Sequence, residues 1–163
     1  MGNLLKQQEE ELAVFELFAS VCGLSILRES IRQQNPPKPD ISCKLKTGMN
    51  VEFELTNSID QELARKMNDS RILDKGGFNN DDPIERMILN KIEKLKEGKY
   101  KRSAESFELL VYLGMMPIFP YQEKAIPQFL ERNRGQQGFD RIWIFRDDQE
   151  NPQILWSIDR QIT

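Results

Sequence analysis

The fold follows from the stretch NPPKPDISCKLKTGMNVEFELT, residues 35–56. Proline lacks a backbone donor and restricts the residue before it, so the prolines that precede Asp40 hold the chain extended. Two runs of alternating apolar and polar residues follow, at 40–45 and 49–56, with Gly48 in the short segment between them. Alternation of this kind on both sides of a glycine-containing turn predicts an antiparallel β-hairpin.

The register of the hairpin follows from which side chains can share a face. A two-residue loop would place Ile41 opposite Glu54, which mixes apolar and charged partners on each face. A three-residue loop, 46–48, with Gly48 at the position of positive φ, instead places Ile41 opposite Phe53. Three pairs then share the other face of the hairpin: Asp40 with Glu54, Ser42 with Glu52, and Lys44 with Asn50.

Two acids opposite one another repel unless a counter-charge compensates them. The chain contains no histidine, which excludes catalytic histidines and histidine-bound metals. Two or three carboxylates with water make a hard oxygen site that suits Mg²⁺ or Mn²⁺, so Asp40, Glu52 and Glu54 are candidate ligands. In the alternative interpretation, these acids face solvent on an edge hairpin.

The remaining patterns predict an α/β fold with a mixed central sheet flanked by helices. Asp82 and Pro83 form an N-cap and first helical position. The full set comprises helices at 7–22, 58–68, 83–97 and 124–132, further strands at 24–31, 107–113, 141–145 and 154–158, and a polar loop at 70–82.

Two cations and one further acid are candidates for the carboxylate site. Lys91 falls in the middle of the apolar stripe of the helix at 83–97, where a cation must extend to solvent or meet a carboxylate. Lys94 lies at the edge of that stripe. Glu16 belongs to a narrow polar strip on the first helix, which faces either solvent or the site.

The overall charge excludes a general attraction to polyanions. The chain has 23 basic and 26 acidic residues and a net charge of -3, so contact with nucleic acid needs a local patch such as the basic segment 86–102. No apolar run approaches the ~18 residues of a membrane span. The first residues also lack the apolar region of a signal peptide, so we expect a cytoplasmic protein without a membrane partner.

These residues resemble the PD-(D/E)XK nuclease superfamily, in particular a bacterial branch of uncharacterised restriction-endonuclease-like proteins. The resemblance spans roughly residues 16–112 and includes Pro39-Asp40 and Glu52-Phe53-Glu54. It implies a restriction-endonuclease-like core in the order helix, three strands, helix, strand. On this reading the chain is one domain, 1–163, with a core at about 7–113 and a C-terminal extension at about 114–163.

The resemblance also implies roles for individual residues. Asp40 matches the metal-binding aspartate, and Glu16 matches an optional acid of the first helix. If Glu52 is the second acid, Glu54 stands where the motif has lysine. If Glu54 is the second acid, Thr56 stands there, and the lysine has moved to the following helix as Lys91 or Lys94.

The resemblance implies a Mg²⁺- or Mn²⁺-dependent nuclease that hydrolyses phosphodiester bonds of nucleic acid, and DNA is the expected substrate. Cutting both strands would imply a two-fold homodimer. Because the lysine of the motif is missing from its usual position, an alternative stays open: a nuclease-like domain that binds nucleic acid or an unidentified protein partner without cutting. A third reading is an unrelated α/β interaction module.

Overall fold

The structure is a computed structural model that describes residues 2–57, 82–134 and 138–160. Its helices and strands, in chain order, are α1 (Gly2–Val21), β1 (Ile26–Gln33), β2 (Ile41–Leu45), β3 (Asn50–Asn57), α4 (Pro83–Lys96), β4 (Ser106–Tyr112), α5 (Pro120–Arg132), β5 (Arg141–Arg146) and β6 (Gln153–Asp159). The helix expected at 58–68 lies outside the described residues, as does the loop expected at 70–82 apart from Asp82.

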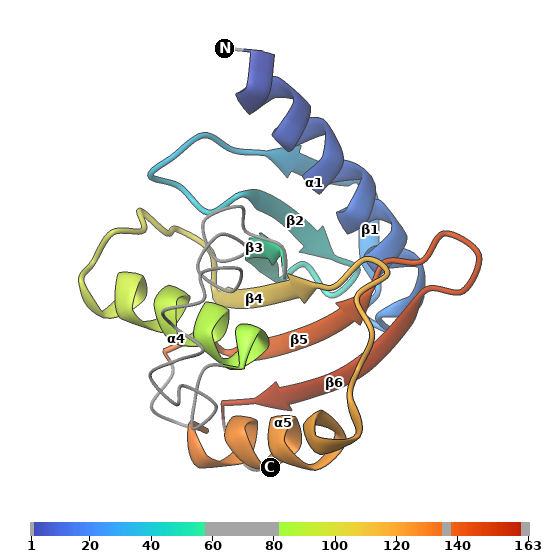
Figure 1. Ribbon diagram of the computed structural model, residues 1–163. Coiled ribbons are helices and arrows are strands. Elements are labelled where there is room, and N and C mark those ends of the chain that lie inside the picture. The colour runs from blue at the N-terminus through green and yellow to red at the C-terminus, as the bar shows by residue number, and fades with distance from the viewer. Residues whose placement is uncertain (1, 58–81, 135–137, 161–163) are drawn as a thin grey trace.

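The six strands form one mixed sheet in the order β1-β2-β3-β4-β5-β6 (Figure 1). The strands β3, β4 and β5 are parallel, whereas the pairs β1–β2, β2–β3 and β5–β6 are antiparallel. Helix α4 precedes β4 and helix α5 precedes β5. Because crossovers between adjacent parallel strands are right-handed, both helices pack on the same face of the sheet. The predicted α/β architecture with a mixed sheet is confirmed.

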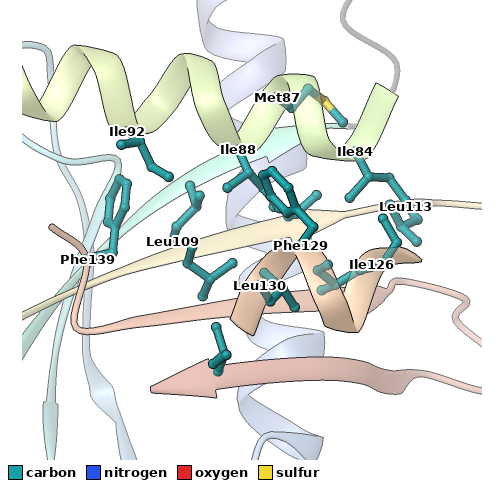
Figure 2. Packing of buried hydrophobic residues seen from close by; sticks show 14 of the residues in the cluster. Ile84, Met87, Ile88, Ile92, Leu109, Leu113, Ile126, Phe129, Leu130 and Phe139 are labelled. Atoms are coloured by element: carbon teal, nitrogen blue, oxygen red, sulfur yellow. The ribbon is translucent and has the colours of Figure 1, made fainter. Parts of the chain in front are cut away.

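Each face of the sheet carries its own apolar core. One core lies beneath α4 and α5, where Ile88 and Phe129 pack over Leu109 and Ile142 (Figure 2). The other lies beneath α1, where Phe15 and Phe18 contact strand residues of the opposite face. Since successive strand residues point to opposite faces, β3 places Phe53 and Leu55 toward α1 and its two acids toward the α4 side.

The predicted hairpin register is confirmed. Ile41 lies opposite Phe53, Ser42 opposite Glu52, and the connecting turn contains Gly48 with a φ of 95°. The predicted N-cap is also present, because the Asp82 carboxylate accepts hydrogen bonds from the backbone of Ile84 and Glu85.

The starts of two helices and the position of one strand differ from the expectation, and the strand, β1, spans Ile26–Gln33 rather than 24–31. Helix α1 begins at Gly2 rather than at residue 7, and α5 begins at Pro120 rather than at residue 124. The early turns of α1 present exposed leucines and polar residues, so burial does not mark where this helix starts. In α5 the fixed φ of a proline suits the first helical position.

None of the helices in the described part of the chain is both long and apolar enough to cross a membrane.

Candidate active site

Two acids meet where β2 begins beside the middle of β3. Asp40 directly precedes β2, and its carboxylate accepts a hydrogen bond of 2.8 Å from the backbone N–H of Leu55. That bond anchors Asp40 beside Glu54, whose side chain lies on the α4 side of β3 and is buried. The hairpin register therefore gives the acid pair that the sequence pattern predicts.

Asp40 is the more perturbed member of this pair. Burial, together with the nearby charges of Glu54 and Glu11, raises the pKa of its carboxyl from the ordinary value of 3.8 to about 8. The hydrogen bond from Leu55 opposes this shift but is too weak to cancel it. When both acids of this buried pair are ionised, they carry more negative charge than the surrounding protein compensates.

Lys91 partly compensates this charge. Its ammonium nitrogen lies 2.8 Å from Oε2 of Glu54, and the two side chains are only 17% and 9% exposed, respectively. The ion pair joins α4 to β3 across 37 positions of sequence. Lys94, one helical turn further on, is exposed. The structure thus brings Lys91, rather than Lys94, to the acids.

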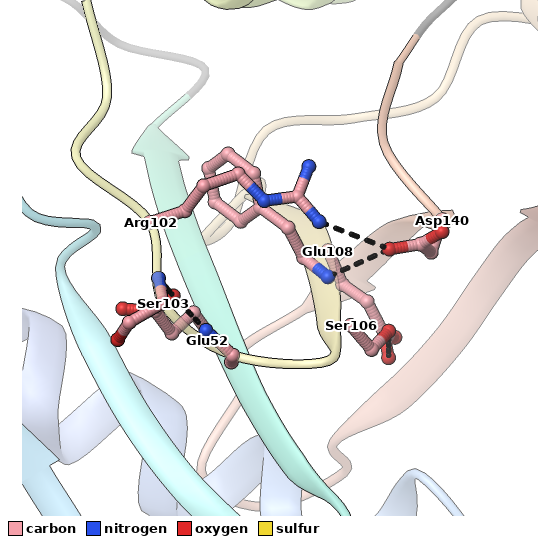
Figure 3. Close-up of polar contacts among 8 residues, drawn as sticks. Glu52, Arg102, Ser103, Ser106, Glu108 and Asp140 are labelled. Atoms are coloured by element: carbon pink, nitrogen blue, oxygen red, sulfur yellow. Dashed lines mark hydrogen bonds and ion pairs between the residues drawn. The ribbon is translucent and has the colours of Figure 1, made fainter.

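Glu52 lies two residues from Glu54 on the same strand face but has separate partners. Its carboxylate accepts hydrogen bonds from the backbone N–H groups of Ser103 and Ala104, at 2.7 and 2.8 Å (Figure 3). The side chain of Gln34 donates a further hydrogen bond to it, at 3.0 Å. Burial raises the pKa of Glu52, but these hydrogen bonds outweigh burial and hold it below the usual value. Glu52 therefore anchors the segment before β4 rather than facing Asp40.

We expect Glu52→Gln to lower the free energy of unfolding by about 1–2 kcal/mol, because a neutral amide replaces a charged acceptor. The lowered pKa means that the stabilisation by Glu52 is complete above pH 4.5 and is lost as the pH falls through the folded-state value. Urea unfolding at pH 7 and pH 4 measures both effects. Exposed Glu105→Gln is the matched control, and an equal loss in both variants would contradict the assigned role.

The first helix contributes a different acid from the one expected. Glu16 is exposed and lines a separate hollow with Arg28 and Gln149, so the structure does not bring it to Asp40. Glu11 is buried instead, and it interacts electrostatically with both Glu54 and Lys91. Burial raises the pKa of Glu11, a hydrogen bond from Gln7 opposes the shift, and the charge of Glu54 adds to it.

Tyr100 is a second neighbour that the sequence analysis missed. Its hydroxyl oxygen is buried and has no hydrogen-bond partner of ordinary geometry among the described residues, although the carboxylate of Glu54 is near enough to act on it as an acceptor. Burial raises the pKa of Tyr100, and the charges of Glu54 and Asp40 add to this effect. A buried hydroxyl without a partner costs free energy unless water or a ligand satisfies it.

The oxygen donors of this site fit a hydrated divalent cation. Within the ranges that the structure describes, no three cysteine, aspartate or glutamate side chains form a ready-made metal cage. Mg²⁺ does not require one, because it usually keeps several waters and binds through one or two carboxylates. Asp40 and Glu54 meet that requirement, and a bound water would satisfy the hydroxyl of Tyr100.

Comparison of the chain with protein-family models, with curated proteins and with solved structures finds no match. The functional argument therefore depends on the geometry of the site.

Proposed function

We propose that this protein is a Mg²⁺- or Mn²⁺-dependent nuclease with a restriction-endonuclease-like core, which hydrolyses phosphodiester bonds of nucleic acid. One observation carries the proposal: Asp40, Glu54 and Lys91 come from three separate parts of the chain and meet in one buried site. The order of α1, three strands, α4 and β4 supports it, because the PD-(D/E)XK resemblance implies the same order.

Each residue of the site has a role in this proposal. Asp40 and Glu54 would hold the ion, which when bound polarises the phosphate and lowers the pKa of its water. Lys91 has three N–H donors, one of which bonds Glu54, and another would stabilise the charge that develops on a phosphate oxygen. Exposed lysines of the segment 86–102 would contact the phosphate backbone without reading sequence.

A second candidate function is binding of nucleic acid without cleavage. The specific observation in its favour is that Thr56 occupies the position of the motif lysine, while the ammonium of Lys91 already neutralises Glu54. A site that is largely compensated in this way would bind a cation weakly. The two functions differ in whether a bound metal ion leads to cleavage of the nucleic acid or affects only the protein.

The test is incubation of the 163-residue chain with single-stranded DNA, double-stranded DNA and RNA, each with Mg²⁺, Mn²⁺ or EDTA. We expect cleavage with metal, none in EDTA, and activity at the background level in Asp40→Asn. The exposed acid variant Glu93→Gln serves as the control that keeps activity. Nucleic-acid binding without any cleavage, which survives Glu54→Gln, would reject the nuclease and support the second function.

A further inference from the structure

A polar hollow of about 420 Å³ lies beside the acid pair on the same side of the sheet. Its lining includes Ser42, Lys44, Asn50 and Glu52, which share a face because Ser42 pairs with Glu52 and Lys44 with Asn50. On this face the core beneath α4 and α5 uses β4, β5 and β6, whereas β2 and the start of β3 present polar groups. The volume lies within the range of small-ligand sites.

An irregularity in strand pairing shapes the hollow. Between the pairs Leu27–Lys44 and Arg32–Ser42, β1 advances five residues while β2 advances two. Ser30 replaces the missing ladder bonds, because its hydroxyl accepts a hydrogen bond of 2.8 Å from the backbone N–H of Lys44. Bulges of this kind re-aim side chains and occur beside functional sites. This one places Arg32 opposite Ser42, where it lines the hollow.

The hollow is positively charged. Arg32 donates from one terminal nitrogen to the backbone carbonyls of Glu29 and Ile31, at 2.7 and 2.8 Å, which fixes the guanidinium and leaves its other nitrogens for a ligand. Neither Arg32 nor Lys44 forms an ion pair within the described part of the chain. The one acid, Glu52, already accepts three hydrogen bonds.

We propose that this hollow binds one nucleotide, with its phosphate on Arg32 and Lys44 and its sugar or base against Ser42 and Asn50. Two fixed or exposed cations suit a phosphate, and the hydroxyl and amide groups suit the polar edge of a sugar or base. Glu52 and Glu54 are about 7 Å apart along β3, so the hollow adjoins the acid pair. The choice of a nucleotide over another phosphorylated ligand rests on the proposed function.

Binding in EDTA tests the pocket without cleavage. The probes are a fluorescein-labelled 12-nucleotide DNA strand, adenosine monophosphate and inorganic phosphate, and the variants are Arg32→Gln/Lys44→Gln, Ser42→Gln and the exposed control Lys46→Gln. We expect the double variant to weaken strand binding about tenfold or more and to lower the salt slope by about 0.7, because both cations contact a single phosphate. Ser42→Gln should weaken binding by filling the hollow.

The competing ligands separate the two sources of a nucleotide. If adenosine monophosphate displaces the strand from the wild type but binds more weakly than the strand, the hollow binds a nucleotide within a strand. If adenosine monophosphate binds more tightly than the strand, the hollow binds a free nucleotide. Displacement by phosphate alone at equal concentration, or an equal loss in Lys46→Gln, would overturn the proposal. Intact binding with no metal-dependent cleavage would reject the nuclease and keep the pocket.

Discussion

Replacing Lys91 by methionine is expected to lower the free energy of unfolding by about 3 kcal/mol at pH 8 and to slow metal-dependent cleavage by about 100-fold or more. Methionine keeps most of the apolar stem but removes the ammonium that lies 2.8 Å from Glu54. The variant therefore leaves two buried acids without their nearest cation. Removing one partner of a buried ion pair lowers the free energy of unfolding by more than the intact pair contributes to it.

Urea unfolding in EDTA measures the stability effect, and Lys94→Met is the matched control because it removes the same charge from an exposed position on the same helix. The double variant Lys91→Met/Glu54→Gln should recover most of the stability, since it removes the unpaired charge as well. An equal loss in Lys94→Met, or no recovery in the double variant, would contradict the pairing. Cleavage should remain slow in the double variant in either case.

Sequence reasoning found the acid pair because both of its steps depend on local geometry. Strand alternation determines which residues share a face, and the glycine turn determines the register. The placement of Asp40 near Glu54 therefore follows from the sequence of one hairpin. Lys91 was identifiable for a similar reason, because a cation within an apolar helical stripe must find a partner. Its choice of Glu54 required knowledge of how α4 packs on β3.

The same reasoning could have found Glu11 but did not. Glu11, Val14, Phe15 and Phe18 follow the spacing of one helical face and are the buried residues of α1. Glu11 at the start of this buried face resembles Lys91 within the apolar stripe of α4, because each is a charged residue that needs a partner. Glu16 was considered because it lies on the polar strip, where exposure is the ordinary outcome.

Tyr100 and the polar hollow depend on long-range packing. Tyr100 lies in a connecting segment with no periodicity, and only the fold brings its hydroxyl toward the acids. The hollow arises from a shift in register between β1 and β2, which alternation in either strand alone does not reveal. Both features require the positions of elements relative to one another, which local patterns do not supply.

Asp40→Asn is expected to stabilise the metal-free protein by about 2 kcal/mol at pH 8.5, because it removes a buried charge, while it abolishes metal-dependent cleavage. The folded-state pKa of Asp40 is raised from 3.8 to about 8, so between these values the unfolded chain releases a proton that the folded protein keeps. Wild-type stability should therefore fall as the pH rises from about 4 to about 8 and then level off. Asparagine removes this cost, although it accepts a weaker hydrogen bond from Leu55.

Unfolding at pH 5.5 and pH 8.5, in EDTA and in Mn²⁺, separates this effect from general changes in charge. The free energy of unfolding of the wild type relative to that of Asp40→Asn should be lowest at pH 8.5 in EDTA. Glu93→Gln should show the same pH dependence as the wild type, because the carboxylate of Glu93 is exposed. Mn²⁺ at about 100 times its Kd should restore about 2.7 kcal/mol to the wild type at pH 8.5 and less at pH 5.5, where it must displace a proton. Asp40→Asn should gain little from Mn²⁺. A wild type that grows more stable relative to Asp40→Asn as the pH rises would show that the surroundings of Asp40 already compensate its ionised form, and the site would then need no added cation.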